Sequence, residues 1–460
     1  MMAYDLPDIS ASLYESTKKA HPGKQFPEIL KTLMASGTLE ETRFPSATAS
    51  RIQLQHYCTD RNLIAGAEKI FNDIALAPDC IGKDAFKLKR ALIVILTNLL
   101  MRHFSTPKLC TSIPHNKNAY KLIKRYNPRE IGYRSTIAAI SGLKYCGYIH
   151  MEDGWFDKES RTGKETKTRL TAKLTETLTH AYSINKSTFE NLEHGEEIIL
   201  KDNNKKWKDY TDTDQTNKIR KAVKTYNNLL RKTRITITDE DDTNQQYDLS
   251  SNQYHRSFNN CSFQEGGRFY GPWWQSVSVD HRKHIQINGN QTIELDYSAM
   301  HIHLLYGYEG KEYYDLFPLN DDPYMLPEYG DIERKALKYG ILIGLNASNQ
   351  GEGLYAIREK LKEDGLYSDG MNLKEILKQF CAKHPIISHY LYSGIGLRTQ
   401  YTDSCVAEYV IKKLTSRKIT CLCIHDSFIV EARHRDLLEE LMIKGFKANK
   451  LKSVPLIKEG

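Results

Sequence analysis

The apolar positions of the chain follow a helical period in the N-terminal part and form shorter, strand-like runs later on. Up to about residue 125 the pattern is helical, with Pro or Gly between the segments. The longest apolar run, residues 91–101, lies between Arg90 and Arg102 and is too short to span a bilayer. We therefore expect a buried helix that begins near Asp84, within an N-terminal half that is mostly helical.

A further helix and two strands are predicted near the middle of the chain. Residues 133–145 carry apolar side chains at helical spacing, and Gly147 is expected to end this helix. The preceding Asn-Pro-Arg-Glu at 127–130 has the order of an N-cap, a first-turn proline and an acid. Residues 148–156 and 167–171 are predicted as strands joined by a loop with basic residues.

This order of a helix, Gly-Tyr-Ile and a basic β-hairpin resembles a winged helix-turn-helix domain. The resemblance implies that the helix with Arg134 faces the major groove of DNA and that the hairpin is the wing. Lys164, Lys167 and Arg169 would then contact phosphates. Two alternatives stay open: a winged helix used only for protein contacts or packing, and a segment that is not a winged helix.

Two segments in the C-terminal half each place one aspartate where an apolar strand ends. Residues 293–301 contain Asp296, and residues 421–430 contain Asp426. Such an aspartate is commonly a turn residue or a helix N-cap. If the strands lie side by side, however, both carboxylates reach the same divalent metals, as phosphoryl transfer by two metals requires. Carboxylates and phosphate oxygens form the hard oxygen set that Mg²⁺ prefers, and Mn²⁺ could replace it.

The residues around these aspartates carry a family resemblance. Residues 296–298 (Asp-Tyr-Ser) after an apolar strand resemble motif A of the family A DNA polymerases, and residues 425–426 (His-Asp) resemble their motif C. Residues 424–428 (Ile-His-Asp-Ser-Phe) are closer still to motif C of the bacteriophage-type single-subunit RNA polymerases. Residues 266–269 (Gly-Gly-Arg-Phe) are similar to the family A segment that precedes motif A and touches the primer–template.

Motif B would lie between A and C, as a helix with a triphosphate-binding Lys and an aromatic residue four positions later. Lys335 and Tyr339 have this spacing and share one helix face. Family A also places Arg four residues before the Lys, where this chain has Asp331. Arg334 or Lys338 could substitute for that arginine.

The resemblance covers roughly residues 255–445 and departs from the family at several positions. Motif A of the family carries a Glu five residues after its Asp, which helps to exclude a ribose 2′-hydroxyl, and here that position is His301. The second aromatic residue of motif B is replaced by Ile343. The interval between motifs A and C is short, which implies reduced fingers. The loss of the Glu favours tolerance of ribonucleotides.

The resemblance implies template-directed nucleotidyl transfer, with Asp296 and Asp426 holding two Mg²⁺ ions. The partners would be a nucleic acid, as primer–template or duplex DNA, and nucleoside triphosphates. Lys335 would neutralise charge on the triphosphate, Tyr339 would stack on the incoming base pair, and His425 would position the primer end. Further candidates at the substrate are Arg334, Lys338, Tyr297 and His301, and further candidates at the nucleic acid are Arg268 and Arg282.

Composition is consistent with a nucleic-acid enzyme and excludes little. The 460 residues include 65 Lys and Arg against 57 Asp and Glu, and the net charge of +8 is a modest excess. The 28 tyrosines could stack on bases, although packing is their commoner use. Nine cysteines lack a zinc-binding spacing, which favours a reduced, cytoplasmic setting. We expect neither a secretory signal nor a membrane span.

We expect an α+β chain whose mostly helical N-terminal half includes the winged-helix region and whose C-terminal part is a polymerase-like palm with an antiparallel sheet and reduced fingers. The expected regions are a helical segment at 1–109, the winged-helix-like region at 110–183, a helical connector at 184–254 and the palm at 255–460.

Two other functions stay open. The first is a non-catalytic replication initiator or regulator of a mobile element with a degenerate palm, which His301 and Ile343 favour and the retained aspartates disfavour. The second is a metal-dependent nuclease or transposase, which needs a third acid. Glu294 is the nearest acid, and we expect it to point to the strand face opposite Asp296. The choice between DNA and RNA, the need for a primer and the host process are not determined by these patterns.

Overall fold

The computed structural model describes residues 49–160, 162–190, 192, 195–238, 247–326, 331–368 and 371–460. These residues form two compact units. The first comprises 49–53, Cys58–Ala119 and Ile131–Phe189, and the second comprises Leu54–Tyr57, Tyr120–Glu130 and Glu190–Gly460. The expected division into four regions stays a prediction, and its first 48 residues lie outside the described part. None of the described helices is long and apolar enough to cross a membrane.

The first unit packs helices against a four-stranded sheet. Its helices are α3 (Arg61–Ile74), α4 (Ala85–Ser105), α5 (Tyr133–Tyr145) and α6 (Ala172–Thr179). Its sheet has the order β1 (Ala49–Arg51), β2 (Cys110–Ile113), β6 (Thr166–Leu170) and β3 (Ile149–Glu152). The predicted helix start near Asp84 is confirmed, because this carboxylate accepts a hydrogen bond from Lys87 N at 3.1 Å and caps α4.

The predicted helix at 133–145 is confirmed, but its predicted start signal is wrong. Gly147 follows α5 with a φ of 70°, a conformation that ends helices and suits glycine. Residues 127–130 do not begin the helix: Gly132 is the N-cap, and Glu130 has a φ of 52°. The chain therefore turns once more between the Asn-Pro segment and the first helical residue.

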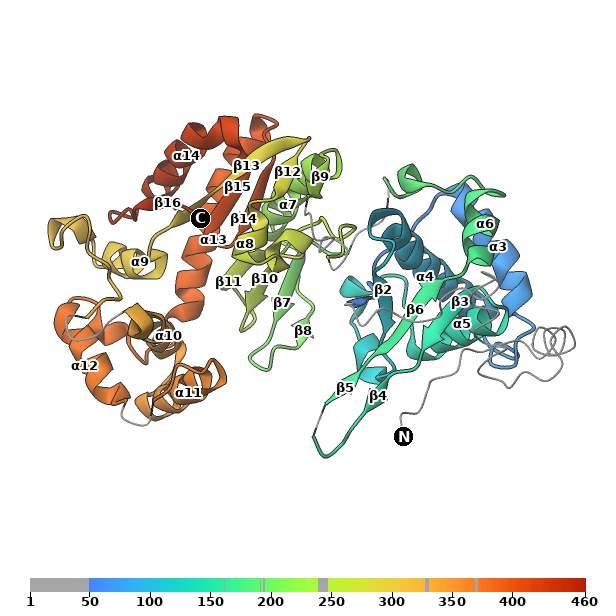
Figure 1. Cartoon of the computed structure of the whole chain (residues 1–460), viewed down its shortest axis with the longest axis horizontal. Coiled ribbons are helices and arrows are strands. Elements are labelled where there is room, and N and C mark those ends of the chain that lie inside the picture. The colour runs from blue at the N-terminus through green and yellow to red at the C-terminus, as the bar shows by residue number, and fades with distance from the viewer. Residues whose placement is uncertain are drawn as a thin grey trace, which may run out of the picture. The chain divides into compact units, whose positions relative to one another are not determined.

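The hairpin of β3 and β6 continues as a narrow ribbon of β4 (Trp155–Phe156) and β5 (Gly163–Lys164), as Figure 1 shows. Between residues 149 and 170 the sequence has five acidic and five basic residues. The hairpin thus carries no net charge, and the expectation of a basic wing is wrong. The winged-helix assignment itself stays a prediction.

The second unit contains two sheets. The larger has the order β14 (Cys421–Ile424), β15 (Ser427–Glu431), β13 (Asn290–Tyr297), β12 (Ile285–Ile287) and β9 (Ile235–Ile237), and β16 (Ile457–Glu459) also pairs with β13. The smaller has the order β11 (Ser262–Tyr270), β10 (His255–Asn259), β7 (Ile198–Lys201) and β8 (Trp207–Lys208). Every pairing in the larger sheet is antiparallel. The α+β class with an antiparallel sheet in the C-terminal part is therefore confirmed, although β7 and β10 in the smaller sheet pair in parallel.

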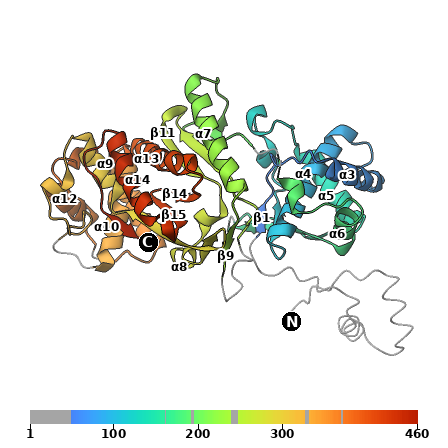
Figure 2. The ribbon, with the colours of Figure 1, turned by 90° about the horizontal axis from the view of Figure 1, so that it is seen from above.

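Long helices pack on these sheets. They are α7 (Asp214–Arg231), α13 (Gly396–Ser416) and α14 (Arg435–Ala448). α13 packs against β11, α7 and α14, and Figure 2 shows α13 and α14 beside β14 and β15. Val410, Leu422, Phe428 and Phe446 belong to the apolar core that these elements share. The sequence patterns of residues 402–416 and 435–448 predict two helices, and α13 and α14 confirm both, although α13 begins earlier, at Gly396.

Four further helices form a separate part of the second unit with its own apolar core (Figure 1). They are α9 (Met300–Tyr308), α10 (Asp331–Asn346), α11 (Gln350–Glu363) and α12 (Leu373–Lys383). The charged pattern of residues 360–378 predicts one helix, but this prediction is wrong, because Gly365, with a φ of 67°, follows the end of α11 and α12 begins only at Leu373. This helical part occupies the chain position at which reduced fingers are expected.

The turn between β12 and β13 sets the register of the central strand. Asn288 and Gly289 have φ values of 56° and 82°, the left-handed pair that a tight two-residue hairpin requires. Ile287 pairs with Asn290 across this turn, as expected for Asn-Gly between two apolar, alternating segments. Since strand side chains alternate with a period of two, the turn determines the face on which Asp296 lies.

Candidate active site

Asp296 and Asp426 lie next to each other on the larger sheet. Asp296 is opposite Ser427 in the β13–β15 ladder, and Asp426 directly precedes Ser427 in the chain. Both aspartates line the same cavity, whose volume is about 390 Å³. The structure thus brings together the two carboxylates that the sequence patterns placed at separate strand ends.

The turn between β14 and β15 consists of His425 and Asp426. Ile424 pairs with Ser427, so only these two residues connect the strands. His425 has a φ of 59°, a left-handed conformation that such short turns use. All residues of β14 and β15 are buried. The buried strands therefore hold Asp426 at the edge of a packed core.

The electrostatics of Asp296 indicate an excess of negative charge. Burial, then Asp426 and then Glu294 raise the pKa of Asp296 to about 7, although Lys338 and Arg282 oppose this. A divalent cation with hard oxygen ligands would offset this charge, so the site fits Mg²⁺. No three His, Cys, Asp or Glu side chains of the described residues are grouped to hold a metal. Phosphate oxygens and water would have to complete its coordination.

We predict that Asp296→Asn stabilises the metal-free protein above about pH 7. A carboxyl whose pKa is raised on folding keeps a proton that the unfolded chain releases, so stability falls as the pH rises from about 4 to about 7. The gain at about pH 8 should be about 2 kcal/mol, since solvent screens part of the about 4 kcal/mol that the raised pKa represents. Urea denaturation in EDTA measures it. The difference should vanish towards about pH 4, and a variant less stable than the natural protein at about pH 8 would contradict the prediction.

Glu294 shares the strand face of Asp296, so the expectation that it points the other way is wrong. Side chains alternate along a strand, and residues two apart therefore lie on the same face. The Glu294 carboxylate lies 3.0 Å from Arg282 Nε and accepts a hydrogen bond from Ser427 Oγ. These contacts hold it within the protein. They also account for Arg282, which was expected to contact nucleic acid and is instead largely buried beside Glu294.

Cations from three elements line the cavity beside the two aspartates. They are Arg268 on β11, Arg334 and Lys338 on α10, and Lys458 on β16. Opposite charges at short range in a partly buried site attract strongly. A cavity with two carboxylates and four cations suits a polyanion that binds together with a metal.

Two glycines directly precede Arg268, which lines the cavity. Gly266 and Gly267 have φ values of 77° and 76°, and a side chain on Gly267 would meet a phenylalanine ring at 2.8 Å. The ladder between β10 and β11 shifts register nearby, which is a bulge that redirects the strand. Beneath it, the buried Arg256 donates to Gly267 O at 2.7 Å and pairs with Glu408 at 2.6 Å. The bulge before Arg268 therefore requires glycine at both positions, because of their positive φ values and the close packing at Gly267.

Asp403 on α13 is a site residue that the sequence analysis missed. Its side chain is 1% exposed and accepts a hydrogen bond from Arg268 Nε at 2.9 Å. His301 Nε2 lies 3.3 Å from the same carboxylate and 3.0 Å from Arg268 Nη2. The sequence signal was an acid within the apolar stripe of an amphipathic helix, a position that acids seldom occupy without a partner.

Arg334 and Lys338 line the cavity, whereas Lys335 and Tyr339 do not. Residues four apart share a helix face, and the next residue along is rotated by about 100°. Lys335 is exposed, and its ammonium lies 5.8 Å from the centre of the Tyr339 ring. Tyr339 packs against the core of the helical part. The pair expected for motif B therefore does not line the cavity of the aspartates. The helix face with Arg334 and Lys338 lines it instead.

Tyr297 differs from the role expected of it, whereas the role of His425 at the primer end stays a prediction. Tyr297 borders the cavity, but its side chain is buried in the core and its hydroxyl donates to Met442 O at 2.7 Å. The His425 ring lies against the Tyr270 ring, with 5.1 Å between centres. Burial and then Arg268 lower the pKa of His425, which keeps the imidazole neutral at pH 7.

Lys458 is a second site residue that the sequence analysis missed. It is the partner of Asp296 in the β13–β16 ladder, and directly opposite residues project from the same face of a sheet. β16 has only three residues, so it lacks a hydrophobic pattern that could have identified it as a strand.

The other predicted nucleic-acid contacts belong to the first unit. Arg134 on α5 and Lys164 on β5 are exposed, and Lys167 on β6 is half-buried. Arg169 lines a cavity of about 640 Å³ within that unit. Their role at a nucleic acid remains a prediction.

No protein-family model and no curated protein matches the chain. Among solved structures, the POL domain of Pol1 from M. smegmatis in complex with DNA primer-template and dNTP is similar over 88% of this chain, at 11% identity and a TM-score of 0.27. The match spans 66% of the length of that structure's chain. Such a low TM-score supports neither a shared fold nor a shared activity.

Proposed function

We propose that this chain is a template-directed nucleotidyltransferase that uses two divalent metals, Mg²⁺ by preference. One observation supports this most strongly. Asp296 and Asp426 lie side by side in a cavity whose remaining wall carries Arg268, Lys338 and Lys458. Paired carboxylates facing a cationic wall match the needs of a reaction that joins a hydroxyl to a nucleoside triphosphate.

The residues of the cavity divide into groups with different tasks. Bound metal would supply activation of the attacking hydroxyl and stabilisation of the leaving pyrophosphate, and Asp296 and Asp426 would hold it. Lys338 and Arg334 neutralise charge on the triphosphate, in place of Lys335. Arg268 contacts the nucleic acid beside the reacting end.

The nuclease alternative loses its third acid in this arrangement. Glu294 is on the correct face, but Arg282 and Ser427 already bind its carboxylate. The non-catalytic initiator differs from a polymerase in one measurable respect, which is the absence of incorporation.

Primer extension tests the proposal. The purified chain should extend a labelled primer with Mg²⁺ and either deoxyribonucleotides or ribonucleotides, and EDTA should stop it. Binding of the primer–template without any extension under either set of nucleotides would favour the non-catalytic initiator.

We predict weak sugar discrimination. His301 stands where family A polymerases carry the Glu that opposes a 2′-hydroxyl, and a His bound to Arg268 and Asp403 supplies no carboxylate there. Single-turnover incorporation of matched ribo- and deoxyribonucleotides on one template measures the ratio. A preference for deoxyribonucleotides of about a thousandfold or more, about 4 kcal/mol in the transition state, would show that another residue excludes the 2′-hydroxyl.

A further inference from the structure

The hairpin of β7 and β8 in the second unit gathers four lysines, which we call the hairpin lysines. They are Lys201, Lys205, Lys206 and Lys208. Three of them are exposed and Lys201 is half-buried. Ordinary solvated lysines are commonly interspersed with acids, so the question is where the acids of this hairpin are engaged.

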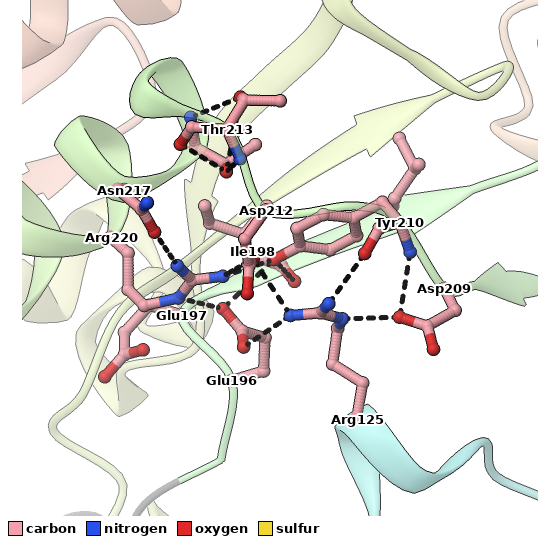
Figure 3. A network of polar contacts seen from close by, with 12 residues as sticks. Arg125, Glu196, Glu197, Ile198, Asp209, Tyr210, Asp212, Thr213, Asn217 and Arg220 are labelled. Carbon is pink, nitrogen blue, oxygen red and sulfur yellow. Dashed lines mark hydrogen bonds and ion pairs between the residues drawn. The ribbon is translucent and has the colours of Figure 1, made fainter.

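The acids of the hairpin are bound by groups other than the lysines. Asp202 accepts hydrogen bonds from the backbone N–H groups of Asn204 and Lys206, at 2.9 and 3.0 Å, and so forms the turn. Asp209 accepts from Arg125 Nε at 2.6 Å, as Figure 3 shows. Both carboxylates therefore bind groups other than the lysine ammonium groups of the hairpin.

The neighbouring acids are bound in the same network. Arg125 and Arg220 both contact Glu196 and Asp212, with Arg220 Nη2 2.7 Å from Asp212 Oδ1 and Arg220 Nε 2.8 Å from Glu196 Oε1 (Figure 3). The arginine side chains are less than one-fifth exposed, and planar guanidinium groups suit such forked contacts. Two arginines thus neutralise the carboxylates near the hairpin. These carboxylates are therefore not paired with the hairpin lysines.

The lysines themselves have no carboxylate partner among the described residues. Burial and then the neighbouring Lys205 lower the pKa of Lys201, as expected where like charges gather. Holding like charges together costs stability, so such a group is expected to meet an anion.

The hairpin is also rigidly attached. Tyr126 OH donates to Lys208 O at 2.8 Å and accepts from Leu200 N at 3.0 Å, so one side chain ties both strands. The Trp207 ring packs edge-on against Tyr126, with 4.9 Å between centres. A fixed support lowers the entropy lost when the lysines bind a ligand.

The position of the hairpin indicates which anion it meets. β8 and β11 are the two edges of the smaller sheet, three strand spacings apart, which is about 14 Å. Arg268 on β11 lines the cavity with the two aspartates. At about 3.4 Å per base pair, a duplex that leaves that cavity along the smaller sheet would reach the hairpin within its first turn.

We infer that the hairpin lysines bind the phosphodiester backbone of a nucleic-acid duplex without regard to its sequence. The identification of that duplex as the primer–template rests on the function proposed above. The binding itself does not depend on catalysis. Lysine ammonium groups act as point charges, so the contact should appear as salt-dependent affinity.

The test compares the natural protein with Lys205→Gln/Lys206→Gln/Lys208→Gln. Fluorescence anisotropy with labelled DNA and RNA hairpin duplexes, in EDTA and without nucleotides, gives the affinity at several salt concentrations. The slope of log affinity against log salt should be smaller by about 2 to 3 in the variant, since each lost phosphate contact contributes about 0.9. Between about 50 and about 200 mM salt, the natural protein should therefore lose about 40-fold more affinity than the variant.

The matched control is Lys444→Gln/Lys447→Gln/Lys452→Gln, which removes the same charge from exposed positions on and after α14. It should keep the natural slope. Equal slopes in all three proteins, or equal losses in both variants, would overturn the inference. A hairpin-dependent slope with either duplex, in a protein that extends no primer, would uphold this inference and refute the proposed function. Primer extension by a protein whose slope does not change in the hairpin variant would support the proposed function and refute this inference.

Discussion

Nucleotide incorporation should fall by about a thousandfold or more in Asp296→Asn and in Asp426→Asn, a loss of about 4 kcal/mol of transition-state stabilisation. Each substitution removes one of two adjacent carboxylates that would hold the metals, while the amide keeps the shape of the side chain. Single-turnover primer extension with Mg²⁺ measures the loss. Circular dichroism and a urea transition establish that both variants fold.

The control for this prediction is Asp436→Asn on α14. Its side chain is 96% exposed and does not line the cavity. Incorporation should therefore stay within about twofold of the natural rate. If either cavity variant retained a tenth of the natural rate, the pair would not be the metal-binding group and the proposed function would fail.

The largest effect on stability is expected for Asp403→Ala, at about 3 kcal/mol of destabilisation. The substitution leaves Arg268 largely buried without its carboxylate partner, which is the costly way to break a buried ion pair. It also releases His301, which shares that carboxylate. Urea denaturation at pH 7 provides the measurement.

Two further variants locate the cause of this loss. Asp403→Asn keeps an acceptor but not the charge, so it should lose less stability than Asp403→Ala. Asp436→Ala removes an exposed aspartate and should change stability by no more than about 0.5 kcal/mol. A loss below about 1 kcal/mol in Asp403→Ala would show that Arg268 finds other partners and that Asp403 does not hold the site.

The carboxylate pair could be predicted because its signals are local. Asp296 ends an apolar strand whose register is set by Asn288 and Gly289, and Asp426 lies in a turn between two buried strands. Each of these features depends on residues close by in the chain. Only the pairing of β13 with β15, which brings the two aspartates together, depends on residues far apart in the chain.

The partners of the pair depend on packing and could not be predicted in the same way. Asp403 meets Arg268 across 135 positions of sequence, and only the fold of α13 against β11 brings them together. Spacing also failed on α10, where Lys335 and Tyr339 satisfy the motif yet do not line the cavity with the aspartates. A helical period states which residues share a face but not which face meets the site.

The most direct test of the central claim is single-nucleotide extension on four primer–templates that differ only in the next template base. With Mg²⁺, the chain should add the complementary nucleotide on each template, and Asp296→Asn should add none. If the chain extends no primer, or if the added nucleotide does not change with the template base, it is not a template-directed nucleotidyltransferase.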